Sequence, residues 1–237
     1  MTKLHANILT LFPEMFPGAL GGGVTGRGLD QGLWSYNAVN IRDFATDNYK
    51  TVDDTPFGGG AGMVMKPDIV ASAIESIETP GRMIFMSPRG RVLDQKLAHE
   101  LVEEKHITLL CGRYEAVDQR VLDAYGFEEV SIGDYVLSGG ELAAMVLLDS
   151  CVRLIPGVVG NQDTTHSESH ENGLLEHNHY TRPAEWIDFK GKNRDVPDVL
   201  LSGHHKNIDN WRYEHSKEIT RNNRPDMWKS FLDKENE

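Results

Sequence analysis

The first 156 residues alternate between short apolar runs and stretches in which apolar residues recur at helical spacing. Residues 3–12 and 33–41 are typical of strands, whereas residues 67–77 carry apolar side chains at positions 69, 70, 73, 74 and 77, as one face of a helix does. Asp94 is suited to cap a further helix that runs to about residue 104. Alternating strands and helices favour an α/β fold, a mostly parallel sheet covered by helices on both faces.

Three predicted strands end in polar, glycine-containing segments. Residues 87–91, 111–115 and 132–140, here called the strand-end segments, follow the apolar runs 83–86, 107–110 and 127–132. Ligands of open α/β sheets bind at the carboxyl ends of the strands, where glycines let the backbone approach closely. Any one of these segments alone is better interpreted as a plain turn. Together they predict a site for a polar small molecule that carries an aromatic base.

The alternation of predicted strands and helices stops after residue 159. Residues 159–172 are polar and lack periodicity, which is typical of a flexible linker or of a segment that orders when a ligand binds. Helical patterns return near residues 207–221 and 225–232. We therefore expect one domain at 1–160, a linker at 161–173 and a small, mainly helical domain at 174–237.

The net charge of −12 favours an enzyme of small metabolites over a binder of nucleic acid. Residues 176–237, however, hold 11 Lys and Arg against 12 Asp and Glu, so a local basic face is compatible with that part. The only cysteines are Cys111 and Cys151, and neither a membrane-length apolar run nor a leader pattern is present. These features predict a cytoplasmic protein without disulfides and without a membrane partner.

Two other sequence patterns are only weak indications of a dinucleotide site and of a metal site. Residues 21–26 match G-x-G-x-x-G, but Pro13 and Pro17 separate them from the preceding strand, and the chain has no P-loop. His166, His170 and the pair His177 and His179 gather in sequence without a cysteine pair or an H-E-x-x-H run. We therefore expect solvated histidines and no metal site built from them.

Several longer motifs stand together in an order that is specific to one family. They are residues 11–16 (LFPEMF), 42–44 (RDF), 51–54 (TVDD), 57–60 (FGGG), 111–115 (CGRYE), 131–137 (SIGDYVL), 180–183 (YTRP) and 202–205 (SGHH). With these motifs the chain closely resembles the bacterial tRNA (guanine-N1)-methyltransferases, which modify guanosine 37 beside the anticodon. The resemblance covers nearly the whole chain.

The resemblance implies a SPOUT-type α/β domain with a mostly parallel sheet and a C-terminal trefoil knot, plus a small, mainly helical C-terminal domain. It implies S-adenosylmethionine as methyl donor, the tRNA anticodon stem-loop as partner, and a homodimer with the active site at its interface. Family members also use Mg²⁺, whose ligands the sequence does not indicate. The knot would be an exception to the rule against knotted chains.

The same resemblance assigns a cofactor role to residues of all three strand-end segments. Main-chain amides and carbonyls of residues 132–137 would hold the adenine, and a carboxylate at Glu115 would lie near the cofactor. The residues expected at the cofactor are Ser87, Pro88, Gly90, Gly112, Tyr114, Glu115, Ile132, Gly133, Asp134, Tyr135, Val136, Leu137, Gly139 and Gly140.

Methylation at guanine N1 requires removal of the N1 proton and stabilisation of the charge that develops on O6. Arg153 matches the family arginine thought to bind O6, although a helix-terminal cation is the alternative. The family base is an aspartate in an Asp-Ser-Phe run, where this chain has Glu168, Ser169 and His170. We assign Glu168 as general base, with Asp53 and, more weakly, His170 as rivals.

Residues expected to bind the nucleotide or its phosphates come from both parts of the chain. They are Asp53, Gly58, Gly59, Arg113, Arg153 and Arg182, with Lys206 as a further cation. A surface charge is the alternative for each cation. Two other functions remain open on the sequence: a SPOUT-like module that binds tRNA but has lost catalysis, and a doubly wound enzyme of nucleotide metabolism, which the missing P-loop disfavours.

Overall fold

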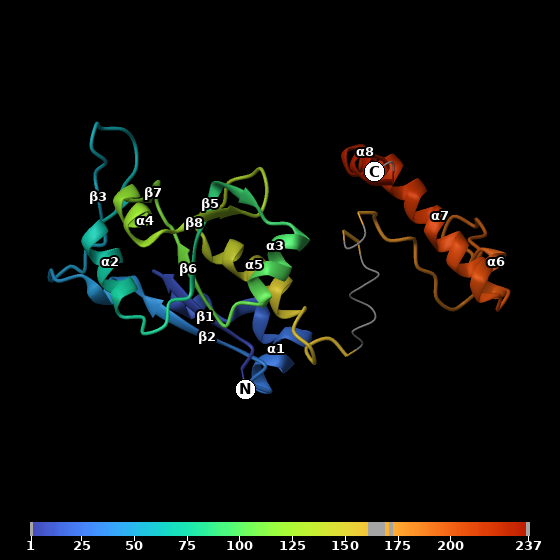
Figure 1. Cartoon of the computed structure of the whole chain (residues 1–237), viewed down its shortest axis with the longest axis horizontal. Coiled ribbons are helices and arrows are strands. Elements are labelled where there is room, and N and C mark those ends of the chain that lie inside the picture. The colour runs from blue at the N-terminus through green and yellow to red at the C-terminus, as the bar shows by residue number, and fades with distance from the viewer. Residues whose placement is uncertain (1, 161–168, 171–172, 236–237) are drawn as a thin grey trace. The chain divides into compact units, whose positions relative to one another are not determined.

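The structure of the chain is a computed structural model, and it describes residues 2–160, 169–170 and 173–235. The chain divides into two compact units, Met1–Gly160 and Asn161–Glu237 (Figure 1).

Unit 1 is built on a five-stranded sheet in the order β2-β1-β6-β5-β8 (Figure 1). Every neighbouring pair in this sheet is parallel, which confirms the predicted mostly parallel α/β fold. The strands are β1 (Leu4–Thr10), β2 (Trp34–Asn40), β5 (Arg82–Val92), β6 (His106–Cys111) and β8 (Glu128–Ser131). The connecting α-helices are α1 (Gly23–Asp30), α2 (Pro67–Glu75), α3 (Gln95–Val102), α4 (Gln119–Tyr125) and α5 (Glu141–Val152).

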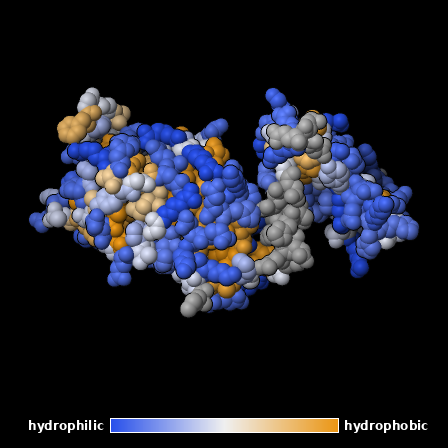
Figure 2. Space-filling model, in the orientation of Figure 1, coloured by the Kyte–Doolittle hydropathy of each residue, from blue (hydrophilic) through white to orange (hydrophobic). Residues whose placement is uncertain are grey.

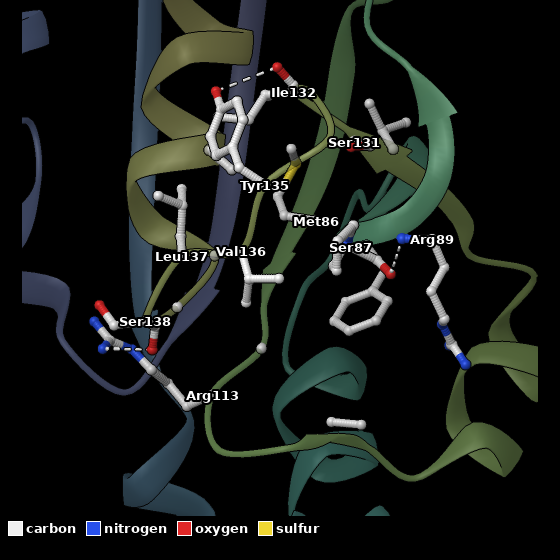
Figure 3. Close-up of a pocket in the computed structure, with 18 of the residues that line it drawn as sticks. Met86, Ser87, Arg89, Arg113, Ser131, Ile132, Tyr135, Val136, Leu137 and Ser138 are labelled. Atoms are coloured by element: carbon white, nitrogen blue, oxygen red, sulfur yellow. Dashed lines mark hydrogen bonds between the residues drawn. The ribbon is translucent and has the colours of Figure 1, made fainter.

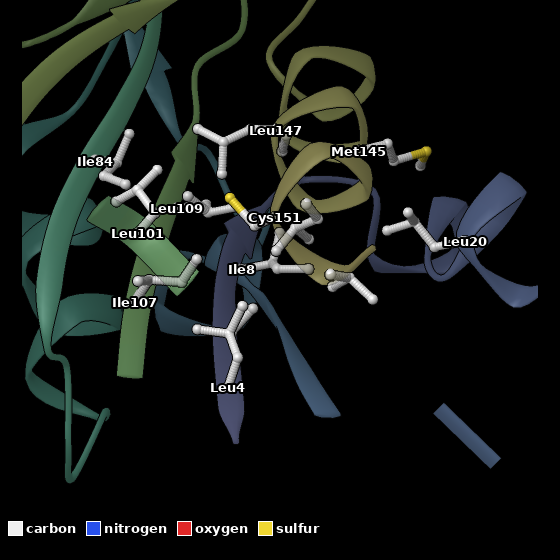
Figure 4. Packing of buried hydrophobic residues seen from close by; sticks show 14 of the residues in the cluster. Leu4, Ile8, Leu20, Ile84, Leu101, Ile107, Leu109, Met145, Leu147 and Cys151 are labelled. Carbon is white, nitrogen blue, oxygen red and sulfur yellow. The ribbon is translucent and has the colours of Figure 1, made fainter. Parts of the chain in front are cut away.

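The sheet buries a separate apolar cluster on each face. Leu4 and Ile8 of β1 point to one face and pack with α3 and α5, whereas Leu9 points to the other and packs with α2 and α4. This alternation is the two-residue period of a strand. Figure 4 shows Leu147 and Cys151 of α5 directed at the strands of the first cluster. Helices thus cover both faces, and the ends of the strands remain for a site.

Local signals fix the predicted helices. The carboxylate of Asp94 accepts a hydrogen bond from the amide of Leu97 at 2.7 Å, which confirms the predicted cap of α3. Pro67 begins α2, a position that suits proline because its missing amide hydrogen would have no partner there.

Helix α1 was not predicted, because residues 23–30 are rich in glycine, a poor helix former. Tertiary contacts override that propensity. The indole of Trp34 donates to the carbonyl of Thr25 at 2.9 Å, and a Cβ at Gly28 would stand 2.9 Å from Val158. Glycine there allows the close packing that holds the helix.

The strand-end segment 87–91 was expected to be a loop, but it lies inside β5, which continues to Val92. The pairing of β5 with β8 shifts register between Met86 and Arg91, so the intervening residues form a bulge. A Cβ on Gly90 would lie 2.2 Å from the carbonyl carbon of Glu129, so only glycine allows the two strands to approach here. The segment resumes pairing after the bulge, a long-range effect that the local sequence does not reveal.

Short elements complete unit 1. A second sheet, in the order β3-β4-β7, lies within and beyond the polar segment 43–62. Its strands are β3 (Asp53–Asp54), β4 (Val64–Met65) and β7 (Ala116–Val117), and the 3-10 helices are η1 (Pro13–Met15), η2 (Gly18–Gly21) and η3 (Ile41–Phe44).

Unit 2 contains the helices α6 (Asp198–Leu201), α7 (His205–Asn223) and α8 (Pro225–Glu235). Helices α7 and α8 include the two predicted helical stretches, whereas α6 was not predicted. The face of this unit visible in Figure 2 is mostly hydrophilic. Among the described residues, no helix has the length and apolar character needed to cross a membrane.

Candidate functional site

A cavity of about 240 Å³ lies in unit 1 where the neighbouring strands β6, β5 and β8 reach the strand-end segments (Figure 3). All three segments contribute to its wall. Of the residues predicted to bind a cofactor, all but Gly90 and Asp134 line it: Ser87, Pro88, Gly112, Tyr114, Glu115, Ile132, Gly133, Tyr135, Val136, Leu137, Gly139 and Gly140. The structure therefore brings together segments that are distant in sequence.

Sequence reasoning missed part of the lining. Phe85, Met86, Arg89, Ala116, Val130, Ser131, Ser138 and Ala143 also line the cavity. All eight lie inside the strand-end segments or within three residues of them. Their position beside a predicted ligand segment is the signal that would have found them.

The segment 132–140 is fixed by its own hydrogen bonds. The hydroxyl of Ser131 donates to the carbonyl of Gly133 at 3.0 Å, and the hydroxyl of Tyr135 donates to the carbonyl of Ile132 at 3.3 Å. Figure 3 shows the second bond, with Val136 and Leu137 following along the cavity wall. Val136 is 82 % exposed, so an apolar surface is available to a flat aromatic group.

Two strand-end segments meet backbone to backbone at Gly140. Its amide donates to the carbonyl of Gly112 at 3.0 Å. A Cβ on Gly140 would lie 2.7 Å from the Cα of Cys111. This contact shapes the floor of the cavity, because any side chain would push the two segments apart.

A hydrogen bond and an ion pair to Glu129 stabilise the bulge of β5. The hydroxyl of Ser87 donates to Glu129 at 2.5 Å, and the Arg89 guanidinium forms an ion pair with the same carboxylate at 3.0 Å. Gly62 lies against Glu115, because a Cβ at Gly62 would be 2.3 Å from Cγ of Glu115. The glycine-rich loop at 57–62 therefore reaches the cavity wall.

A buried ion pair joins the remaining parts of the site. The Arg113 guanidinium lies 2.9 Å from the carboxylate of Glu141, which is 1 % exposed. The same carboxylate accepts from the hydroxyl of Thr10 at 2.7 Å, and Arg113 donates to the carbonyl of Ser138 at 3.2 Å (Figure 3). The guanidinium also lies over the ring of Phe12. Arg113 thus ties the segments 111–115 and 132–140 to the end of β1.

Replacing Glu141 by glutamine is expected to lower the free energy of unfolding by about 3 kcal/mol, because the charge of Arg113 loses its buried counter-charge. The loosened segments should also bind the cofactor more weakly. Urea unfolding measures the first effect, and calorimetric titration with S-adenosylhomocysteine measures the second. Glu103→Gln, an identical change at an exposed position, is the control. Unfolding midpoints that coincide for both variants would contradict this role for the ion pair.

The thiols of the two cysteines are expected to be unreactive in the folded protein. Burial, with a smaller effect of the Glu141 charge, raises the pKa of the Cys111 thiol well above its usual value, and burial raises the pKa of Cys151 to about 12. Both thiols therefore stay protonated at neutral and mildly alkaline pH. We expect neither to react with iodoacetamide at pH 8 in the native protein and both to react in denaturant, as mass spectrometry of the intact chain would report. Rapid native alkylation of Cys111 would contradict the closed contact beneath the cavity.

Arg113, which was expected at the nucleotide, also lines the cavity, whereas the other residues predicted for the substrate and the chemistry do not. Asp53 is partly exposed in β3, and Arg153 is partly buried where α5 ends. Gly58 and Gly59 are exposed with positive φ, and Arg182 is exposed in unit 2. Glu168 lies outside the described residues. The cavity wall therefore contains most of the expected cofactor residues but neither Asp53 nor Arg153.

Comparisons with known proteins match the chain over most of its length. The family model described as tRNA (Guanine-1)-methyltransferase TrmD matches residues 4–230. A tRNA (guanine-N(1)-)-methyltransferase of Rhodospirillum rubrum is 59% identical over 231 residues, which cover 97% of this chain and 95% of the relative. Proteins of the same name from Brucella ovis and Brucella abortus are 52% identical over 229 residues, which cover 97% of this chain and 93% and 92% of the relatives.

Proposed function

The chain belongs to the tRNA (guanine-N1)-methyltransferase family, and we propose that it transfers the methyl group of S-adenosylmethionine to N1 of guanosine 37 in tRNA. The observation that carries this proposal is the cavity formed by the three strand-end segments at neighbouring strands. It has the place, the glycine-lined backbone and the exposed apolar groups that a nucleoside cofactor requires.

The chain's own groups suit this cofactor. The main chain of residues 132–137 would hold the adenine edge beside Val136 and Leu137. Glu115 places a carboxylate at the cavity wall, where it favours a cationic sulfonium. The bound cofactor supplies an electrophilic methyl group. A Mg²⁺ ion, which prefers oxygen ligands, is a further proposed participant, and Glu115 offers such an oxygen.

The proposed chemistry needs a base and a cation. Glu168 would take the N1 proton, and the deprotonated N1 would then accept the methyl group that bound S-adenosylmethionine would supply. S-adenosylhomocysteine, a neutral thioether, would be the second product. Arg153 would stabilise the negative charge on O6 while N1 is deprotonated. Asp53 would recognise the guanosine and is the rival base.

A homodimer would complete the site. Helix α5 is mostly apolar, yet its Leu142 and Val146 are 52 % and 48 % exposed. These side chains lie four residues apart, on one face of the helix. A second copy that covers this face would explain their exposure. It would also explain why Asp53 and Arg153 do not line the cavity within one chain.

The two units would have different roles in methyl transfer and tRNA binding. Residues 1–160 would form the knotted methyltransferase domain, residues 161–173 would connect it to the second unit, and residues 174–237 would bind the tRNA anticodon stem-loop. Gly58, Gly59, Arg113, Arg182 and Lys206 would contact the nucleotide or its phosphates. A cytoplasmic location fits a tRNA substrate.

Transfer of labelled methyl from S-adenosylmethionine tests the proposal, with one tRNA transcript that carries guanosine at position 37 and one that carries adenosine there. Label on the guanosine transcript alone, recovered as 1-methylguanosine, is the expected result. Absence of label on a transcript that still binds would contradict it and favour the inactive tRNA-binding module. Equal labelling of both transcripts would contradict the assignment of position 37.

A further inference from the structure

Three side chains of unit 2 form a cluster outside the site described above. Glu176, His177 and His179 each offer one ligand atom, and these atoms all lie within 4.8 Å of one another. Nε2 of His179 lies 3.0 Å from a carboxylate oxygen of Glu176, and the two imidazole rings stand 4.7 Å apart. We propose that this cluster binds a divalent transition-metal ion of the zinc class.

The donor set selects the type of metal. Two imidazole nitrogens and one carboxylate suit Zn²⁺ or Co²⁺, whereas Mg²⁺ prefers an all-oxygen shell. Tetrahedral coordination at bond lengths of about 2.0–2.1 Å places neighbouring ligand atoms roughly 3.4 Å apart, so modest side-chain movements close the site. Three protein ligands leave one coordination position for water or another small ligand.

A hydrogen bond prepares His177 for this role. Its Nδ1 lies 3.0 Å from the backbone carbonyl oxygen of Asn178. A carbonyl oxygen only accepts, so Nδ1 is the donor in this hydrogen bond, and Nε2 is the ring nitrogen that can bind a metal. Metal-binding histidines commonly donate their second nitrogen to a carbonyl or carboxylate in this way.

The backbone before the cluster is anchored to helix α7. The amide of Leu175 donates to the hydroxyl of Thr220 at 2.8 Å, and that hydroxyl donates to the carbonyl of Ser216 at 2.7 Å. The amide of Glu176 donates to the hydroxyl of Ser169 at 2.9 Å. A cluster whose backbone is held in this way loses little freedom when a metal binds.

The site would add charge to a basic region. His177 and His179 line a cavity of about 400 Å³ that Arg182 and Arg212 also line. A bound divalent cation would place more positive charge there and fix the segment that begins at Glu176. The proposal departs from the sequence-based expectation that His177 and His179 are solvated and bind no metal, which rested on the lack of a common metal motif around them.

Titration of the metal-free full-length chain with Co²⁺, followed by visible absorption, tests the proposal. We expect one equivalent to bind with the intense absorption of tetrahedral cobalt, Zn²⁺ to displace it, and millimolar Mg²⁺ to leave it in place. The double variant His177→Ala/His179→Ala should bind at least about 100-fold more weakly, and Glu176→Gln should bind roughly 10-fold more weakly. His205→Ala, a change at an exposed histidine of the same unit, should bind as the unchanged chain does.

Circular dichroism of each variant separates loss of ligands from loss of folding. A folded double variant that binds Co²⁺ as tightly as the unchanged chain would overturn the proposal, because the metal would then lie on other histidines. An unchanged chain that gives no tetrahedral spectrum would overturn it as well. If the double variant fails to fold, a Glu176→Gln chain that folds and binds with unchanged affinity would still contradict the site.

Discussion

Replacing Glu168 by glutamine is expected to lower the turnover number about 10²–10⁴-fold, the usual contribution of a general base. Glutamine keeps the size of the side chain but cannot accept the N1 proton, so N1 stays non-nucleophilic. Because the residues expected at the cofactor lie elsewhere, the dissociation constant for S-adenosylmethionine should stay near that of the unchanged chain. Single-turnover methylation of the guanosine 37 transcript measures the first quantity and calorimetric titration the second.

Glu171→Gln is the matched control, since it removes a carboxylate three residues away in the same polar segment. It should leave the single-turnover rate within a few-fold of the original. A Glu168→Gln chain that keeps full turnover would move the base to Asp53, the rival carboxylate, and Asp53→Asn would then show the large loss instead.

Replacing Gly140 by alanine is expected to weaken cofactor binding by about 100-fold and to lower the free energy of unfolding by about 1–3 kcal/mol, the usual cost of overpacking. Gly140 has φ −77° and ψ −12°, a conformation that any residue adopts, so the backbone itself allows alanine. The obstacle is the contact of 2.7 Å between a new Cβ and the Cα of Cys111. Backbone cannot swing aside as a flexible side chain does, so the two strand-end segments must separate.

Gly160→Ala provides the control, because a Cβ at that position meets no atom within 4 Å. It should bind S-adenosylhomocysteine as the unchanged chain does and unfold at the same urea concentration. Should Gly140→Ala match this control in both measurements, the cavity floor would not depend on the contact of the two backbones.

Local sequence signals were sufficient for most of the sheet. Apolar runs of four to ten residues and one strong cap at Asp94 gave the strands and helices around the core. The signals failed where tertiary contacts override propensity, as in the glycine-rich helix α1. They failed again at β5, which resumes pairing beyond the bulge only because Gly90 lets its backbone approach Glu129.

The candidate site, like the fold, was predicted only in part from the sequence. The three strand-end segments were identified from glycines that follow apolar runs, and they line one cavity. The pairing of Arg113 with Glu141 was not anticipated, because neither residue carries a sign of its partner 28 positions away. An arginine expected at the substrate thus also has a bracing role inside the fold.

The structure does not place Asp53 or Arg153 at the cavity wall of one chain, and sequence alone could not show this. Spacing along the chain predicts which residues share a strand end, but not how far Asp53 and Arg153 lie from that end in the fold. The exposed Leu142 and Val146 of α5 become informative only when burial is known.

The claim that the cavity between the three strand-end segments binds S-adenosylmethionine is tested most directly by a crystal structure of the chain with S-adenosylhomocysteine. We predict density for the whole ligand in this cavity, with its adenine against the main chain of residues 132–137 and Glu115 near its sulfur. Ligand bound to unit 2, or to another part of unit 1 with this cavity empty, would contradict the proposed site.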